Sequence, residues 1–170
     1  MQPEASREAF RGSLIRVEVE DWPAGEREIV RHPGACAVVA VTPGGEVLLV
    51  RQFREAVGHE LLEIPAGILD VDGEEAQECA ARELLEETGY RATKMERLCS
   101  IYTSPGFTDE RIELFLAETE ESPVAGHTPE AGLDVVRVPI ESVVSASLEG
   151  DILDAKSLIG VLLARERAES

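Results

Sequence analysis

Basic residues are scarce in this chain of 170 residues: Lys and Arg number 16 against 34 Asp and Glu, for a formal net charge of −18. Nucleic acids and anionic membranes are bound by basic surfaces, so this balance argues against both as partners. A small substrate that carries phosphate is compatible with the charge, provided that metal ions and a few arginines reverse the electrostatic field locally.

Long apolar runs and paired cysteines are also missing. The longest apolar run, residues 35–41, is far too short to span a bilayer, and the N-terminal MQPEASREAF lacks the apolar segment of a signal peptide. Cys36, Cys79 and Cys99 form no CxxC motif and lie in apolar surroundings, which is typical of buried thiols in a reducing compartment. We therefore expect a soluble, cytoplasmic protein whose cysteines have no redox or zinc role.

The pattern of apolar residues predicts one domain of the α/β class. At 170 residues and 44% hydrophobic content, the chain can bury a full core. Residues 35–41 and 47–53 are almost wholly apolar and are joined by Pro43-Gly44-Gly45, so they predict central strands buried on both faces. Further strands are expected at residues 61–64, 98–102, 111–116 and 133–138, and helices at residues 74–88, 139–148 and 153–167.

The first 34 residues differ from the rest. Residues 1–11 are polar and are expected to fray, whereas residues 13–20 and 28–32 predict a hairpin around Trp22-Pro23-Ala24-Gly25. An isolated hairpin is only marginally stable, so this one needs the main domain or another subunit to pack against. We therefore divide the chain into an N-terminal hairpin segment, residues 1–34, and a main domain, residues 35–170.

The helix expected at residues 74–88 carries a cluster of acids. Glu83, Glu86 and Glu87 share an arc of roughly 100° on a helix of 3.6 residues per turn, and their charges repel. Lysines would relieve this repulsion, but none occurs before Arg91. Carboxylates without His or Cys favour Mg²⁺ or Mn²⁺, while Arg82 can hold Glu86 in place by a charge-assisted hydrogen bond. The alternative is a solvated acidic helix with no ligand.

Two arginines at the end of the strand at residues 47–53 predict a second part of the site. Arg51 and Arg54 are expected to project from the same side and to clamp a diphosphate. The alternative is that they form salt bridges with nearby glutamates such as Glu55, Glu60 or Glu63. Residues 103–110 predict a long loop that contains acids and the turn formers Pro and Gly. Its length and acids favour a role in binding over a simple connection between strands.

Residues 67–90, GILDVDGEEAQECAARELLEETGY, resemble the Nudix box, in which Gly and Glu precede the pattern Arg-Glu-apolar-any-Glu-Glu-any-Gly-apolar. The match departs from the box at one point, since six residues rather than five separate Gly67 from Glu74. Such a match has a low false-positive risk for a motif. The box positions are filled by Gly67, Glu74, Arg82, Glu83, Leu84, Glu86, Glu87, Gly89 and Tyr90.

The resemblance extends over most of the chain and is greatest to the ADP-ribose pyrophosphatase branch of the Nudix hydrolases. The segments that carry it are EIVRHPGACAVVAV, LLVRQFREAVG, LLEIPAG and SPGFTDE, with Pro105 at the branch's marker proline. The resemblance implies a Nudix fold, which is an α/β/α sandwich around a mixed sheet, and a homodimer that exchanges its N-terminal β-hairpins. The implied reaction is Mg²⁺-dependent hydrolysis of ADP-ribose, a nucleoside diphosphate sugar, to AMP and ribose 5-phosphate.

Roles for individual residues follow from the same resemblance. Two to three Mg²⁺ or Mn²⁺ ions would be held by Glu83, Glu87 and the Ala66 carbonyl, with Glu86 as a third ligand or as an orienting group tied to Arg82. Arg54 would contact the diphosphate and Glu110 the terminal ribose. The remaining expected substrate-binding residues are Arg27, Arg51, Glu63 and Phe107.

The general base is left open by the sequence. The resemblance implies a glutamate on the acidic loop, expected at residues 118–134, before the last strand. This makes Glu130 the first candidate, and Asp134, Glu121 and Glu86 are the others. The substrate is open too, because GDP-mannose, a dinucleoside polyphosphate or an oxidised nucleotide would suit the same motif. A protein that binds ADP-ribose without cleaving it is the alternative from a different class.

Overall fold

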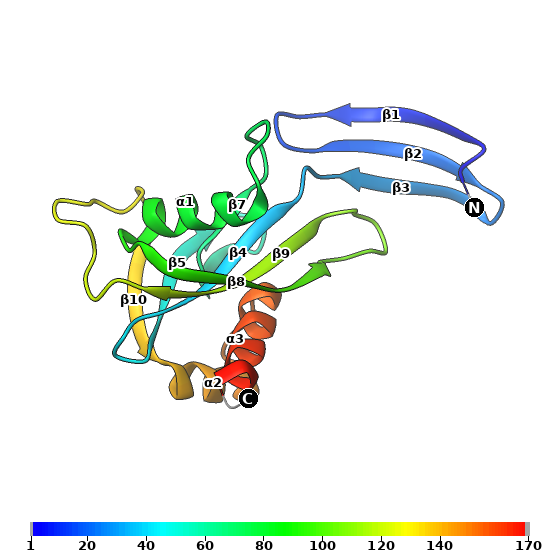
Figure 1. Ribbon diagram of the computed structural model, residues 1–170. Coiled ribbons are helices and arrows are strands. Elements are labelled where there is room, and N and C mark those ends of the chain that lie inside the picture. Colours follow the sequence, from blue (N-terminus) through cyan, green and yellow to red (C-terminus); the bar gives the residue numbers. More distant parts are fainter. Residues whose placement is uncertain (1, 169–170) are drawn as a thin grey trace.

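The computed structural model describes residues 2–168 (Figure 1). Within that range the chain forms ten strands and three helices. The strands are β1 (Ala5–Arg11), β2 (Arg16–Trp22), β3 (Gly25–Arg31), β4 (Ala35–Val41), β5 (Glu46–Arg54), β6 (His59–Glu63), β7 (Ala66–Ile68), β8 (Ala92–Tyr102), β9 (Arg111–Thr119) and β10 (Asp134–Pro139). The helices are α1 (Ala76–Thr88), α2 (Ile140–Glu149) and α3 (Ala155–Ala168).

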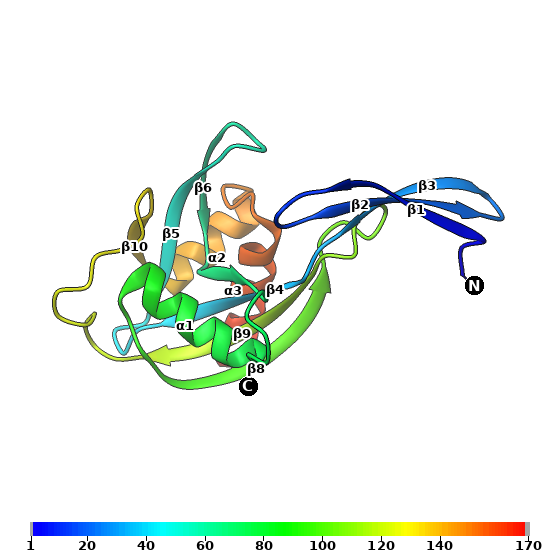
Figure 2. The ribbon, with the colours of Figure 1, turned by 90° about the horizontal axis from the view of Figure 1, so that it is seen from above.

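The strands form two sheets. The main sheet has the order β10-β5-β4-β9-β8, with β6 also paired to β5 and β7 also paired to β4. It is mixed, since β4 and β9 run parallel while the other neighbours are antiparallel. The smaller sheet, β1-β2-β3, is antiparallel and projects away from the main sheet (Figure 2).

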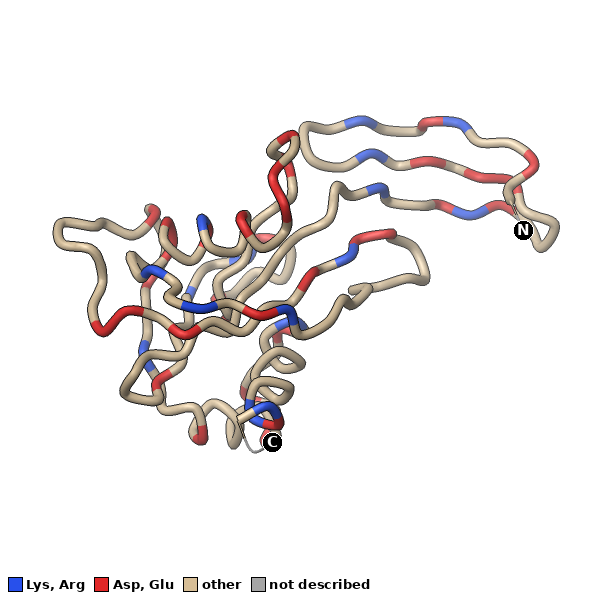
Figure 3. The backbone as a smooth tube through the Cα atoms, viewed as in Figure 1, with Lys and Arg blue, Asp and Glu red and all other residues tan. Residues whose placement is uncertain are grey.

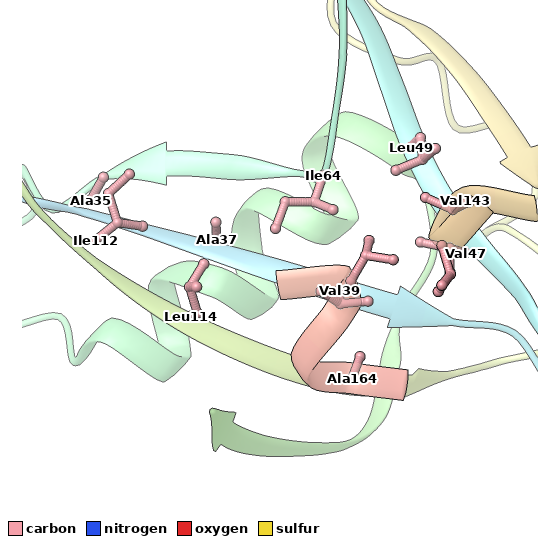
Figure 4. Packing of buried hydrophobic residues seen from close by; sticks show 12 residues of the cluster. Ala35, Ala37, Val39, Val47, Leu49, Ile64, Ile112, Leu114, Val143 and Ala164 are labelled. Carbon is pink, nitrogen blue, oxygen red and sulfur yellow. The ribbon is translucent and has the colours of Figure 1, made fainter. Parts of the chain in front are cut away.

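The alternation of side chains along β4 builds both layers of the core. One set, Ala35, Ala37 and Val39, faces α2 and α3 and clusters with Val143, Val161 and Ala164 of those helices (Figure 4). The other set, Cys36, Val38 and Ala40, faces α1 and clusters with Cys79, Ala80 and Leu84 of that helix. Helix α1 therefore covers one face of the sheet and α2 and α3 cover the other, which confirms the predicted α/β/α sandwich (Figure 1).

The N-terminal segment differs from the prediction of a frayed end and a hairpin. Residues 5–11 form β1, which pairs along its length with β2 and makes a three-stranded sheet. Every residue of β1 is exposed, so the strand has no buried face and its sequence carries no alternation of apolar and polar residues. The expected turn is correct, because Trp22 pairs with Gly25 and Gly25 has φ +108°.

The helix ends follow local signals in the sequence. Helix α1 begins after Glu75, which forms a reciprocal capping box with Glu78, rather than at residue 74. Pro139 is the N-cap residue of α2, so this helix begins one residue later than predicted, and α3 begins at Ala155, two residues later than predicted. Strand β7 was not predicted. Its three residues lie between the apolar residues 61–64 and the loop before α1, and they show no alternation of apolar and polar side chains.

The cysteines are free thiols. Cys36 and Cys79 are fully buried between β4 and α1, as expected, whereas Cys99 is half-buried in β8. Across residues 2–168, no helix has the length and apolar character needed to cross a bilayer.

Gly89 ends α1 and also contacts the acidic loop, which was expected at residues 118–134 and joins β9 to β10 over residues 120–133 in the structure. Its φ is +80°, its N–H donates to the Leu85 carbonyl at 2.8 Å, and its carbonyl accepts from the Val124 N–H at 2.8 Å. The His127 ring lies so close that a Cβ on residue 89 would be 2.6 Å from Cδ2 of that ring. The helix C-terminus is therefore the point at which the acidic loop docks.

Substitution of Gly89 is expected to cost more stability than substitution of a matched glycine. Gly150 caps α2 with φ +89° and has open space around it, so Gly150→Ala costs only the left-handed backbone, about 1 kcal/mol. Gly89→Ala adds the clash with His127 and is expected to lose roughly 2–4 kcal/mol. Urea unfolding measures the free energy of unfolding of both variants. Equal losses of stability would mean that the His127 ring moves away from residue 89 at no energetic cost.

Candidate active site

A cavity of about 600 Å³ lies between β5, β7, α1 and the start of α3. This volume is in the range of sites for small ligands. A larger groove, about 1050 Å³, lies between α1 and β8 and contains none of the predicted site residues. The residues that line the smaller cavity, called the cleft below, are Leu14, His32, Ala35, Gln52, Arg54, Ala66, Gly67, Ile68, Asp70, Arg82, Glu83, Glu87, Glu110, Ile112, Glu130 and Lys156.

Arg82 organises the acids of α1. It is the one basic residue of that helix, and acidic positions recur along the helix and the turn before it (Figure 3). Its guanidinium donates to both oxygens of Glu74 at 2.9 Å, to Glu83 at 2.6 Å and to Glu86 at 3.1 Å. The expected pair with Glu86 is present, and Glu74 keeps its contact with Arg82 although the turn before it has one extra residue.

Glu87 and Glu83 are carboxylates in a dry setting. Glu87 is 6% exposed and accepts from the Ala66 N–H at 3.2 Å. Burial raises the pKa of Glu87 to about 7, and the nearby charge of Glu83 acts in the same direction. Burial also raises the pKa of Glu83, against the hydrogen bond from Arg82. Both groups are therefore short of positive charge.

The donor set fits a hard divalent cation. Carboxylates with a shortage of positive charge and a backbone carbonyl at Ala66 are oxygen ligands of the kind that Mg²⁺ and Mn²⁺ prefer. Gly67 brings the backbone of β7 against Glu83 so closely that a Cβ would lie 2.0 Å from the carboxyl carbon. Within residues 2–168, no three His, Cys, Asp or Glu side chains converge as a ready metal cage. Glu86 instead pairs with Arg82 and is 56% exposed.

The expected diphosphate clamp is wrong as a pair. Arg51 and Arg54 are three positions apart, so alternation places them on opposite faces of β5. Arg54 lines the cleft with Gln52, which is two positions away, whereas Arg51 is exposed and does not line it. The salt-bridge alternative is present as well, because Arg54 donates to both oxygens of Glu63 at 2.7 Å.

Two other expected substrate contacts lie outside the cleft lining. Glu63 is 1% exposed and is enclosed by its partners, so it supports Arg54 instead of facing a ligand. Phe107 is 55% exposed at the tip of the loop of residues 103–110, where its carbonyl accepts from the Val30 N–H at 2.7 Å. Glu110 does line the cleft and accepts from the Thr103 hydroxyl at 2.7 Å.

Arg27 is remote from the cleft of its own chain. It lies at the start of β3, beside the turn at the end of the small sheet that is farthest from α1 (Figures 1 and 2). Its guanidinium donates to the backbone carbonyls of Glu26 and Ala24. A role in substrate binding would therefore require the cleft of a second chain.

The acidic loop brings one base candidate to the cleft. In the described part of the chain, Glu130 lines the cleft, whereas Asp134, Glu121 and Glu86 do not. Asp134 begins β10 and is paired in register with Arg51.

The sequence interpretation missed several residues that line the cleft, among them His32, Gln52 and Lys156. Lys156 carried a usable signal, since it is one of two lysines in the chain and lies in the first turn of a helix. The helix dipole disfavours a cation at that end, so such a placement indicates a specific partner.

Comparison with known proteins agrees with this architecture. A solved structure of an ADP compounds hydrolase has the same fold, with a TM-score of 0.76, 24% identity, and coverage of 99% of this chain and 95% of that chain. The model of the NUDIX domain family matches residues 30–158, and the chain belongs to this family. The family predicted from the box motif is thus confirmed.

The chain is also similar to two bacterial pyrophosphatases. The chain is 41% identical to the ADP-ribose pyrophosphatase of Bacillus subtilis, an alignment that covers 92% of this chain and 88% of the relative. It is 34% identical to the GDP-mannose pyrophosphatase of Cronobacter sakazakii, with 86% of this chain and 84% of the relative covered.

Substitution of Gly67 is expected to weaken metal binding while the fold persists. In Gly67→Ala, the new methyl group would displace the Glu83 carboxylate, whose flexible side chain can move without disturbing the core. The affinity for Mn²⁺, measured by calorimetry, should fall by about 10- to 100-fold. Gly106→Ala is the control, because nothing lies within 4 Å of its Cβ. Unchanged Mn²⁺ affinity in Gly67→Ala would contradict a role for Glu83 as ligand.

Proposed function

We propose that this chain hydrolyses the diphosphate bond of a nucleoside diphosphate sugar, with ADP-ribose as the first choice and AMP and ribose 5-phosphate as products. The observation that carries the proposal is the meeting of Glu83 and Glu87 with Arg54 in one cleft. Acids that lack positive charge can take a divalent cation, and a guanidinium can take a phosphate oxygen. The similarity to an ADP-ribose pyrophosphatase of Bacillus subtilis supports this choice of substrate.

Each side chain has a task in this reaction. Glu83, Glu87 and the Ala66 carbonyl, with Glu86, would hold two to three Mg²⁺ or Mn²⁺ ions. The chemistry available from such ions, when bound, is neutralisation of the diphosphate charge and a lower pKa for water. Arg82 holds Glu83 and Glu86 of α1 and Glu74 of the preceding turn in place through four hydrogen bonds.

The remaining tasks fall to residues on other elements. Arg54 binds a phosphate oxygen, and Glu110 orients the terminal ribose. Glu130 accepts the proton of the attacking water on its carboxylate. Its place on the cleft supports this choice over Asp134 and Glu121.

A substrate panel tests the activity. ADP-ribose, GDP-mannose, a dinucleoside polyphosphate and 8-oxo-dGTP are each incubated with the protein and Mg²⁺, and products are identified by chromatography and mass spectrometry. We expect AMP and ribose 5-phosphate from ADP-ribose and no turnover after chelation with EDTA. Preferred cleavage of GDP-mannose would transfer the assignment to the second candidate, which the relative from Cronobacter sakazakii favours. Tight binding of ADP-ribose without turnover would indicate a sensor instead of an enzyme.

Three variants assign roles within the same assay. Glu87→Gln removes a proposed ligand charge, and kcat should fall by at least about 100-fold with the fold intact. Glu130→Gln removes the proposed base, and a fall of about 100-fold is expected. Glu121→Gln changes the same loop outside the cleft lining and should retain wild-type kcat. Retention of more than about a tenth of the activity in Glu87→Gln or Glu130→Gln would count against its role.

We also propose that the chain acts as a homodimer joined through residues 1–34. Within residues 2–168, the contacts of the small sheet lie mainly between its own strands. The sheet presents Phe10 and a hollow lined by Trp22, Pro23, Ala24, Arg27 and Ile29 to solvent. A partner would cover these surfaces and could bring Arg27 to the second cleft. These features support the exchange of the small sheets between subunits.

Light scattering tests the dimer. The expected result is twice the mass of the chain in wild-type protein and a shift toward monomer in Trp22→Arg, which replaces the tryptophan of the hollow with a second positive charge beside Arg27. Arg7→Ala, an exposed change on β1 outside that hollow, should leave the mass unchanged. A monomer at every concentration would remove the exchanged arrangement.

A further inference from the structure

Arg54 is connected to the C-terminal helix through a buried carboxylate. The Nε and Nη2 atoms of Arg54 donate to the two oxygens of Glu63, both at 2.7 Å. On its other side, Glu63 accepts from the Lys156 ammonium group at 2.5 Å. Lys156 also pairs with Asp154 at 3.0 Å. Residues 54, 63, 156 and 154 therefore form a continuous series of ion pairs with alternating charges, called the ion-pair chain below.

Glu63 and Lys156, the inner members of the ion-pair chain, are almost excluded from water. The side chains of Glu63 and Lys156 are 1% and 9% exposed, whereas that of Arg54 is 42% exposed at the cleft. Burial by itself would raise the pKa of Glu63, but the hydrogen bonds and charges of Arg54 and Lys156 outweigh it and lower that pKa. Removal of one cation would leave Glu63 with a single partner and a poorly compensated charge.

The backbone fixes the place of Lys156. Asp154 accepts from the Ser157 N–H at 3.0 Å, as in a capped first turn, and the Ser157 hydroxyl accepts from the Ile64 N–H at 2.8 Å. The start of α3 is thereby tied to the backbone that follows Glu63. A lysine in this turn opposes the helix dipole, and its contacts with Glu63 and Asp154 offset that cost.

Arg54 needs such support because the pairing of its backbone with His59 of β6 does not fix its long side chain. It is the last residue of β5, before the turn of residues 55–58, and its side chain is partly in solvent. Glu63 is paired in register with Val50, four positions back along β5, so the guanidinium must reach along the strand to meet it. A guanidinium held at two points by a fixed carboxylate presents its remaining N–H groups in one direction.

We propose that Lys156 is a positioning residue, which acts through Glu63 to hold the Arg54 guanidinium in the cleft for the diphosphate of the substrate. This inference rests on the proposed function for the identity of the ligand. It does not depend on that function for the contact between Lys156, Glu63 and Arg54. Two other roles for Lys156 are separable by experiment, namely direct contact with a phosphate and a purely structural contribution to α3.

A double-mutant cycle in the full-length protein separates these roles. The variants are Arg54→Ala, Lys156→Met and the two combined, with KM and kcat measured for ADP-ribose. Lys156→Met should raise KM about tenfold, the effect of one misplaced charge-assisted contact, and Lys156→Arg should recover part of that loss. Once Arg54 is absent, Lys156→Met should change KM by less than about twofold. A tenfold effect of Lys156→Met in both backgrounds would overturn the proposal.

A second readout does not depend on the substrate. In ¹⁵N-labelled protein, the Arg54 Nε–H signal is identified by its loss in Arg54→Ala and should exchange slowly with solvent in the wild type. In Lys156→Met it should exchange at least about tenfold faster. An unchanged exchange rate would overturn the proposal even if ADP-ribose is cleaved. If ADP-ribose is not cleaved, the proposed function fails while this measurement still decides the role of Lys156.

Two controls guard against effects on folding. Lys94→Met removes the other lysine of the chain and its exposed pair with Glu118, and should leave KM and the Arg54 signal unchanged. If Lys156→Met does not fold, Glu63→Gln/Lys156→Met removes both buried charges together and is measured in its place. In that variant Arg54 should again exchange rapidly, and slow exchange would contradict the proposal.

Discussion

The burial of Glu87 beside Glu83 is the constraint on which the site depends. Two acids of one helix face the backbone of β7 with little water, and burial raises the pKa of both. This arrangement is costly without a cation, and Arg82 relieves it only on the Glu83 side. Gly67 lets the two elements approach, since any side chain at that position would occupy the space of the Glu83 carboxylate.

The main sheet brings the residues of the cleft together. Because β4 pairs with β5, β7 and β9, it fixes the place of Arg54, Ala66 and Glu110 relative to one another. The two faces of β4 then carry α1 on one side and α2 with α3 on the other. The cleft thus receives acids from α1, a guanidinium from β5 and an ammonium group from α3, and no one element could supply all three.

Prediction from the sequence succeeded where a residue's role is decided locally. The helix of the box and the pair between Arg82 and Glu86 follow from a spacing of 3.6 residues per turn, and the structure has both. The central strands followed from continuous apolar runs. By contrast, β1 is exposed along its length, so its pairing with β2 left no trace in the apolar pattern.

Prediction failed where distant segments meet. Glu63 was expected either to bind a ligand or to pair with Arg54, and the pair with Arg54 is present. Its second partner, Lys156, is 93 residues away and was not expected. Arg51 was grouped with Arg54 although strand alternation separates them. No spacing rule connects residues 63 and 156, since their contact depends on how α3 docks against the sheet.

The turn before α1 has a consequence for recognising such proteins. It holds one residue more than the box pattern prescribes, yet Glu74 still reaches Arg82 with both oxygens. Gly73, with φ +81° and open space around it, lets the chain absorb the insertion before the helix begins. A search string with a rigid gap between the first glycine and glutamate would overlook this chain, whereas one anchored on the arginine and the acids after it would find it.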